Sequence, residues 1–220
     1  MKRNIVYIIL LAFLFGCGPY IYFKTPQPEN KRNLEKIPSK IIGEYMSVAD
    51  SSIITIDFNK IVKKKFENTI MTLVEFKQET GDSIHNDTSF TFSDNWHIQL
   101  KIRNDSVFIN SSMEETLFEI SEDQILRKYR RYYFLNYRDT NNLWKIELIK
   151  LTKDTLEYGS ILTKEDIERI KGFTTVEEIT DSIDSNKSTK YYLNPARKDL
   201  KKILKFRSKG EKYVKLQKSF

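Results

Sequence analysis

Few side chains in this sequence are of the types that catalyse reactions or bind metals. The 220 residues include one cysteine, Cys17, and two histidines, His85 and His97. His85, Asp87 and His97 offer imidazole and carboxylate groups, but their spacing matches no recurrent metal-ligand motif. A single cysteine also excludes an intramolecular disulfide. The sequence therefore predicts no catalytic residues, no metal site and no cofactor, and we expect a protein that is not an enzyme.

Residues 81–83 read Gly-Asp-Ser, the stretch most similar to a catalytic motif. It resembles the Gly-Asp-Ser block of SGNH-type esterases, in which the serine follows a buried strand. Here residues 75–80 are polar. The resemblance also implies an aspartate and a histidine near the C-terminus, and no histidine follows His97. We interpret Gly81-Asp82-Ser83 as a loop.

Cys17 has the most informative surroundings. Residues 1–3 are a short basic start, and residues 5–15 form an eleven-residue apolar run. This length suits a secretory signal and is too short to span a bilayer. Leu14-Phe15-Gly16-Cys17 resembles a bacterial lipobox. The resemblance implies removal of a signal peptide, residues 1–16, and attachment of diacylglycerol and a fatty acyl chain such as palmitate to Cys17.

Two other interpretations of the N-terminus remain open. Residues 4–23 carry no charge, so a single membrane-spanning helix is physically feasible, although Gly16, Gly18 and Pro19 interrupt it. An ordinary signal peptide with Cys17 incidental is the other alternative. The lipoprotein interpretation predicts a protein of the bacterial cell envelope, outside the cytoplasm and lipid-anchored to a membrane, which we expect to be the outer membrane.

The net charge of +7 is unevenly distributed. Residues 190–220 contain eleven Lys and Arg against two acids, which leaves the body of the chain mildly acidic. A basic tail can meet nucleic acid, anionic lipid or an acidic partner. An address outside the cytoplasm excludes nucleic acid, and a solvated lysine face is the plainest interpretation.

Alternating apolar and polar residues predict strands through the body of the chain. In residues 96–103 the alternation places Trp96, Ile98, Leu100 and Ile102 on one face, before a turn at Asn104-Asp105. Further predicted strands are 41–47, 52–58, 69–76, 107–109, 116–120, 131–137, 144–148 and 156–158. Short turns between strands favour antiparallel pairing. The predicted fold is mainly β, a β-rich α+β protein with a meander sheet that is barrel-like or strongly curled.

Helical signals are fewer. Residues 122–129 are predicted to form a turn or two, and Thr163 to cap a helix over 164–171. Asn194-Pro195 predicts the start of a basic helix whose apolar stripe, Leu200, Ile203 and Leu204, packs on the sheet. The predicted organisation is a signal peptide (1–16), a lipidated Cys17 with a flexible tether (17–37), an antiparallel β domain (38–162) and an α-containing basic segment (163–220).

The run from Arg127 to Phe134 interleaves basic and aromatic side chains. Such a run can bind single-stranded nucleic acid by stacking and phosphate pairing, but the predicted address removes that ligand. An acidic glycan or a phospholipid headgroup remains as a hypothesis. The alternative is a strand whose arginines flank the sheet.

Two resemblances concern the body. Ile37-Pro38, Ile42-Gly43-Glu44-Tyr45, Asp50-Ser51-Ser52-Ile53-Ile54, Tyr132-Tyr133-Phe134-Leu135-Asn136 and Leu143-Trp144 resemble small lipoproteins of Bacteroidota-type bacteria. Gly43-Glu44-Tyr45 also resembles the Gly-x-Trp start of lipocalins. Neither implies an activity or functional residues. We expect a non-enzymatic binding or structural module whose partners are the membrane, through Cys17, and an envelope protein, glycan or apolar ligand. The alternative is a lipocalin-like carrier of a small apolar ligand.

Overall fold

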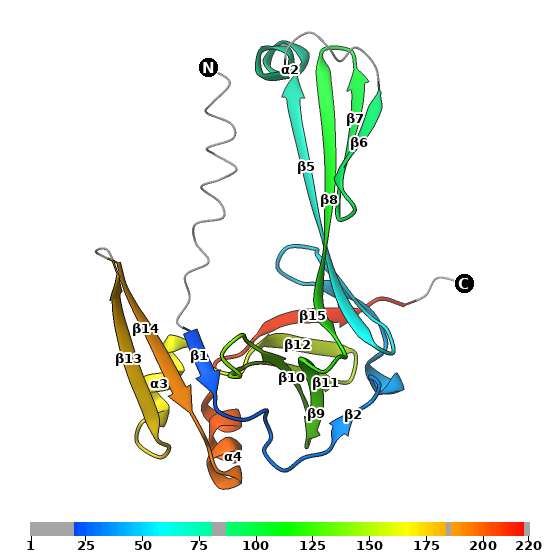
Figure 1. Ribbon diagram of the computed structural model, residues 1–220. Helices are drawn as coiled ribbons and strands as arrows, with labels where there is room; N and C mark the ends of the chain where they lie inside the picture. The colour runs from blue at the N-terminus through cyan, green and yellow to red at the C-terminus, as the bar shows by residue number, and fades with distance from the viewer. Residues whose placement is uncertain (1–19, 81–86, 184–185, 218–220) are drawn as a thin grey trace.

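The computed structural model describes residues 20–80, 87–183 and 186–217 and is mainly β (Figure 1). Its strands are β1 (Tyr20–Phe23), β2 (Asn33–Leu34), β3 (Gly43–Ser47), β4 (Ile53–Ile56), β5 (Lys60–Thr72), β6 (Thr88–Ser93), β7 (Trp96–Arg103), β8 (Ser106–Glu119), β9 (Gln124–Tyr129), β10 (Tyr132–Arg138), β11 (Trp144–Thr152), β12 (Thr155–Ser160), β13 (Val176–Ile183), β14 (Asn186–Leu193) and β15 (Glu211–Lys215). Its helices are η2 (Ser39–Ile41), α2 (Leu73–Thr80), α3 (Lys164–Ile170) and α4 (Arg197–Phe206).

All these strands belong to one sheet, which is antiparallel except where β1 runs parallel to β14. The path of paired strands is β13-β14-β1-β11-β12-β15-β3-β4-β5-β8-β7-β6, with β10, β9 and β2 branching from β11. The prediction of a mainly β, antiparallel fold with short helices is confirmed. The barrel-like alternative is wrong, because the sheet does not close.

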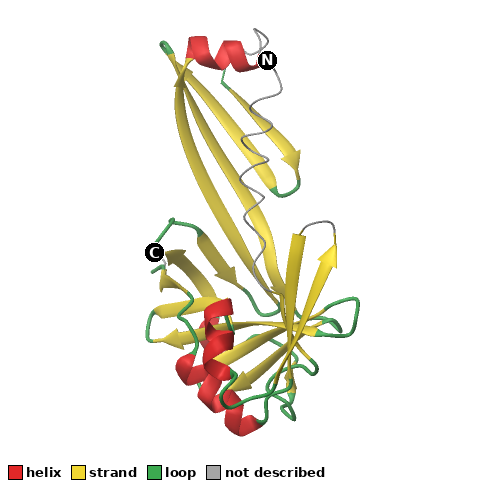
Figure 2. Ribbon diagram, turned by 90° about the vertical axis from the view of Figure 1, so that its left-hand side faces the viewer, coloured by secondary structure: helices red, strands yellow, loops and turns green. Residues whose placement is uncertain are grey.

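The body of the molecule has a core on each face of its central strands. On one face α3 and α4 cover β1, β11 and β14, with Phe23, Trp144 and Leu193 among the buried residues. Figure 2 shows these helices together on one side of the sheet. On the other face Tyr45, Tyr133 and residues from β4, β5, β12 and β15 form a second buried cluster. Side chains fill the space between the curled strands.

The outer parts of β5 and β8, with α2, β6 and β7, form an arm that extends from the body (Figures 1 and 2). Its backbone is the pairing of β5 with β8, which runs from Lys60 opposite Glu119 to Thr72 opposite Ser106 with one register shift between Ile61 and Val62. β7 and β6 widen it, and α2 lies at its tip. The predicted alternation in β7 is confirmed: Leu100 is buried against Phe76 and Val107, whereas Gln99 is exposed.

Two local predictions in this region are wrong. Residues 69–76 were expected as one strand, but β5 ends at Thr72, where the Thr72 hydroxyl accepts from the Glu75 amide and caps α2. Residues 122–129 were expected to be helical, but 124–129 form β9. A tight turn at Arg130 pairs β9 with β10, and Leu126 enters the core, so tertiary pairing overrides a local helical preference.

The expected tether is instead packed on the sheet. β1 pairs with β14 and with β11. Gln27 is fully buried, and its backbone amide donates to Asn136 Oδ1 (2.6 Å) while Asn136 Nδ2 donates to its carbonyl (2.9 Å). Ile37 also enters the core. The pattern of prolines and polar residues was misleading because most partners of this segment, on β9, β10, β11 and β14, lie far along the chain, from Leu126 opposite Leu34 to Leu193 opposite Phe23.

The C-terminal segment contains the predicted helices and also strands that the sequence did not indicate. The Thr163 hydroxyl and the Asp166 carboxylate form a capping box on α3, as predicted for Thr163. The apolar stripe of α4 is buried on the sheet, as predicted. However, α4 begins at Arg197, with Ala196 rather than Asn194 at its N-cap and no side-chain cap.

β13, β14 and β15 join the segment after Leu162 to the same sheet as the predicted β domain. β15 lies between β12 and β3, with Tyr213 opposite both Leu156 and Ser47. The sheet therefore continues across the expected boundary between residues 162 and 163.

Candidate functional site: a basic groove between a turn and a helix

The residues singled out for chemistry do not gather in one place. Cys17, His85 and the Gly81-Asp82-Ser83 stretch lie outside the described residues. His97 is exposed on the arm, with Nδ1 3.2 Å from Thr91 Oγ1. Asp87 pairs with Arg103 (3.0 Å). In the part of the chain that the structure describes, no three His, Cys, Asp or Glu side chains are grouped to hold a metal ion.

The basic and aromatic run divides into a structural part and an exposed part. Arg127 is structural: its guanidinium donates to the carbonyl of Pro28 (3.0 Å) and to Asn33 Oδ1 (2.8 Å). Burial lowers the pKa of this guanidinium from its ordinary value. It therefore holds the N-terminal segment against β9. Arg130 and Arg131, in contrast, form the exposed turn between β9 and β10.

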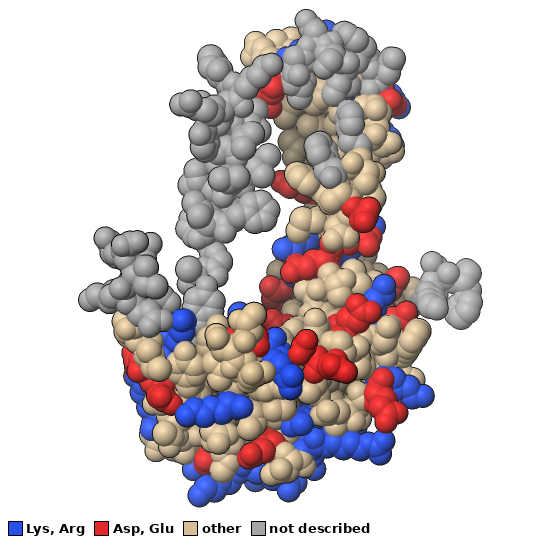
Figure 3. Space-filling view, viewed as in Figure 1, with Lys and Arg blue, Asp and Glu red and all other residues tan. Residues whose placement is uncertain are grey.

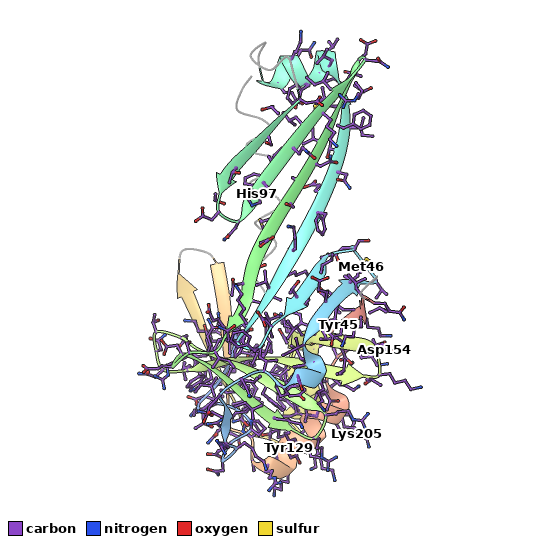
Figure 4. All side chains as sticks on the ribbon, turned by 90° about the vertical axis from the view of Figure 1, so that its right-hand side faces the viewer. Tyr45, Met46, His97, Tyr129, Asp154 and Lys205 are labelled. Atoms are coloured by element: carbon purple, nitrogen blue, oxygen red, sulfur yellow. The ribbon has the colours of Figure 1, made fainter. Side chains whose placement is uncertain are left out.

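This turn meets the basic face of α4 and forms a groove with it. A hollow of about 440 Å³ lies between them. We call it the basic groove; its lining residues are Arg130, Arg131, Tyr132, Lys201, Leu204 and Lys205. Figure 3 shows Lys and Arg gathered at this lower end of the molecule, and Figure 4 places Tyr129 and Lys205 there. Lys201 and Lys205 are one helical turn apart, which puts both on the same face of α4.

The positive charges of the groove are not neutralised by nearby acids. Among the described residues, no ion pair joins Arg130, Arg131, Lys201 or Lys205 to a carboxylate. The same positive charge changes the pKa of the neighbouring Tyr129 phenol. Partial burial raises the pKa of its phenol, but hydrogen bonds and charge from Arg130 and Arg197 outweigh burial and lower that pKa below its ordinary value. Both guanidinium groups lie over its ring, at 5.6 and 5.7 Å.

The floor of the groove is rigidly supported. The Tyr132 hydroxyl donates to the Leu204 carbonyl (3.5 Å). Arg207 and Lys150 lie over the Tyr132 ring, at 5.5 and 5.7 Å, and both pair with Glu157. Glu157 thus compensates the charges of Arg207 and Lys150 beside the Tyr132 ring. The basic residues that line the groove have no such partner among the described residues.

Arg130 occupies a backbone conformation that an arginine rarely adopts. Its φ of 57° places it in the left-handed region, where Asn and Gly are tolerated best. Asn104 and Lys153 hold the first position of two other two-residue turns, at 52° and 54°. The turn geometry does not favour arginine at position 130, although Lys153 shows that a long basic side chain also takes this conformation away from the groove.

Two other features of the structure lack such a charge pattern. Glu147 accepts hydrogen bonds from Tyr137 (2.8 Å) and Tyr158, and burial together with its negative charge raises the pKa of both phenols. This carboxylate is satisfied within the fold. A larger hollow of about 1000 Å³ at the ends of β3, β4 and β15 is bordered by acids as well as Lys215, including Asp154 (Figure 4).

Sequence reasoning noted both halves of the basic groove without joining them. The aromatic and basic run was identified, and the lysines of α4 were assigned to a solvated face. The two segments are 70 residues apart in the chain, from Arg131 to Lys201. The spacing of Lys201 and Lys205 was the available signal, but it does not reveal which element they face.

Comparison with protein families, with curated proteins and with solved structures finds no match for the chain. Within the described residues, no helix combines the length and the apolar character needed to cross a bilayer.

Proposed function

We propose that this chain is a lipid-anchored lipoprotein of the bacterial envelope, attached through Cys17, and that it binds an acidic glycan in the basic groove without catalysing a reaction. One observation carries the proposal. Arg130, Arg131, Lys201 and Lys205 come from two distant segments to surround one hollow, and no carboxylate pairs with them in the described structure. Uncompensated like charges raise the energy of a fold, so an anionic partner explains their placement.

The lining suits a sugar acid in particular. Guanidinium groups can pair with a carboxylate or phosphate through two hydrogen bonds, and lysines add point charges. The Tyr132 ring and the buried Leu204 supply an apolar surface for the C–H groups of a sugar ring. The volume lies within the roughly 300–1,000 Å³ typical of small-ligand sites.

The same features favour a binding module over an apolar carrier. A carrier of the lipocalin kind needs an enclosed apolar cavity. Here the sheet is open, and Tyr45, Tyr133 and Tyr213 fill the space inside its curl. These observations support the choice of the basic groove rather than the sheet interior as the binding site.

Calorimetric titration of the purified full-length protein with polygalacturonate tests the proposal, with neutral dextran as the control ligand. We expect binding to polygalacturonate alone, and we expect it to weaken between about 0.05 M and about 0.5 M salt because salt screens exposed charges. The double variant Arg131→Ser/Lys201→Ser should bind at least about tenfold more weakly, which corresponds to about 1.4 kcal/mol.

The matched control is Lys65→Ser/Lys101→Ser, which removes the same charge from exposed positions on the arm. It should bind like the wild type. Equal losses in both double variants would show that only net charge matters and would refute a site in the groove. Binding to vesicles with anionic headgroups in place of polygalacturonate, if Arg131→Ser/Lys201→Ser abolishes it and Lys65→Ser/Lys101→Ser does not, would assign the groove to lipid and contradict the glycan.

A further inference from the structure

The first strand begins very close to the proposed lipid anchor. β1 starts at Tyr20, three residues after Cys17. Three extended residues span at most about 10 Å. β1 is fixed in the sheet, since its four residues pair with Lys190–Leu193 of β14 and Phe23 also pairs with Trp144. If Cys17 carries lipid, as proposed above, this part of the sheet is held next to the bilayer.

The two faces of the sheet differ at this point. Phe23 and Leu193 point toward α3 and α4, which cover their face (Figure 2). Tyr22 and Tyr192 belong to the opposite face because side chains alternate along a strand. Their rings stack, with centroids 5.8 Å apart and planes 21° from parallel. No helix of the described structure covers that face, where Tyr22 is 9% exposed and Tyr192 is half-buried.

Basic and apolar side chains extend this pair into a surface, which also holds Glu177, opposite Tyr192 and paired with Lys24. Lys145 Nζ lies 5.6 Å from the centroid of the Tyr22 ring. Lys190 precedes Tyr192 by two residues on the same face and is paired with Ile179 of β13. Ile179 is 42% exposed and is one of several large apolar side chains that the described structure leaves in contact with solvent. We call this surface, made of Tyr22, Lys145, Ile179, Lys190 and Tyr192, the tyrosine face.

We propose that the tyrosine face lies against the headgroup region of the membrane to which Cys17 is anchored. Tyrosine is enriched at this depth because its ring is apolar and its hydroxyl is polar. Lysines beside it attract anionic headgroups, and an exposed isoleucine gains by leaving water. Diacylglycerol and a further acyl chain at Cys17 already anchor the protein stably, so contact of the tyrosine face with the headgroups sets the orientation of the protein on the bilayer.

This orientation places the basic groove away from the bilayer. α4 packs on the face of the sheet that holds Phe23 and Leu193, opposite to the tyrosine face. With the tyrosine face against the headgroups, α4 and the groove it lines lie on the side of the sheet that faces away from the bilayer. The groove then opens to the aqueous phase, where an acidic glycan can reach it.

Site-specific labelling of the full-length lipidated protein in vesicles tests the inference. Cys17 is the only cysteine, and lipidation consumes its thiol, so Ile179→Cys, Tyr192→Cys or Lys205→Cys introduces one labelling site. A fluorophore at 179 or 192 should be quenched several-fold more by nitroxide-bearing lipids than by aqueous iodide. At 205, in the groove, the order should be reversed. Ile179→Cys replaces an exposed side chain and keeps the test valid if Tyr192→Cys does not fold.

The outcomes separate this inference from lipidation itself. Fatty-acid labelling is measured on the same samples. A lipidated protein whose labels at 179 and 192 are quenched by iodide as strongly as the label at 205 refutes the tyrosine face and leaves the anchor standing. An unlipidated protein refutes the anchor, and the inference with it.

Discussion

A substitution at Arg130 can separate the effect of this residue on the stability of the turn from its effect on ligand binding in the groove. The Arg130 φ of 57° is strained for a side chain other than Asn or Gly. Arg130→Asn should therefore keep the free energy of unfolding unchanged or raise it by up to about 1 kcal/mol, which thermal melts measure. The same variant should weaken polygalacturonate binding. Lys153→Asn, at a φ of 54° in another turn, is the matched control. It should change the free energy of unfolding by the same amount as Arg130→Asn and leave polygalacturonate binding unchanged. Equal binding losses in titrations of both variants would contradict a specific role for Arg130.

Asp50 should make the turn between β3 and β4 sensitive to acid. Hydrogen bonds from Ser52 and Ser47 lower the pKa of its carboxyl from 3.8 to about 2. A lowered pKa stabilises the fold above the unfolded-state pKa, and this contribution is lost as the pH falls from about 4 to about 2. Asp50→Ala should cost about 1 kcal/mol near neutral pH, since solvent screens this exposed group.

The measurement for Asp50 is a series of thermal melts of both proteins across this pH range. The two melting temperatures should converge near pH 2, where the wild-type carboxyl becomes protonated. A difference that stays constant down to that pH would mean that the carboxylate charge plays no part.

Residue-scale prediction from the sequence worked where the partner is close in the chain. The cap of α3 by Thr163 was predicted because threonine is a favoured N-cap residue directly before the helix it caps. The clamp of Asn136 on Gln27 and the meeting of Arg131 with Lys201 were not, since each depends on how distant strands and helices pack.

Among the elements, the arm has a small core of its own and should lose order separately from the body. Leu100, Phe76 and Val107 form that core, apart from the two clusters of the body. Leu100→Ala should cost about 2–3 kcal/mol and speed amide hydrogen exchange in β6, β7 and β8 while leaving α4 protected. Gln99→Ala, on the exposed face, is the control and should stay within about 0.5 kcal/mol.

The body offers the complementary test. Ile203 is fully buried in the apolar stripe of α4. Ile203→Ala should therefore lower the free energy of unfolding by about 2–5 kcal/mol and shift the main thermal transition to lower temperature. Uniformly faster exchange throughout the molecule in Leu100→Ala would show instead that arm and body unfold together.

Which elements the sequence predicted depended on the distance to their partners. The hairpins β7–β8 and β11–β12 join neighbours through two-residue turns, and alternation revealed them. Most of β5 was missed because both of its faces are exposed along the arm. Polar residues such as Lys64, Lys65 and Glu67 therefore occupy both faces, and the sequence shows no alternation of apolar and polar residues there. β1 was missed because β14, its parallel partner, lies about 170 residues later.

For the whole molecule, the central prediction concerns Cys17. Cys17→Ser should abolish incorporation of a fatty-acid analogue and block removal of residues 1–16, because the thiol that accepts the diacylglycerol is gone. Metabolic labelling followed by gel analysis and membrane fractionation measures both. A variant that is labelled and membrane-bound at the wild-type level would show that the lipoprotein interpretation is wrong.

The place of β15 in the sheet governs when the protein can finish folding. In the described structure the pairing path from β12 to β3 passes through β15, although residues 211–215 are synthesised after every other strand. The two halves of the sheet therefore cannot join through β15 until residues 211–215 have been made. A chain in transit through a narrow translocation pore would hold no completed sheet until those residues had crossed.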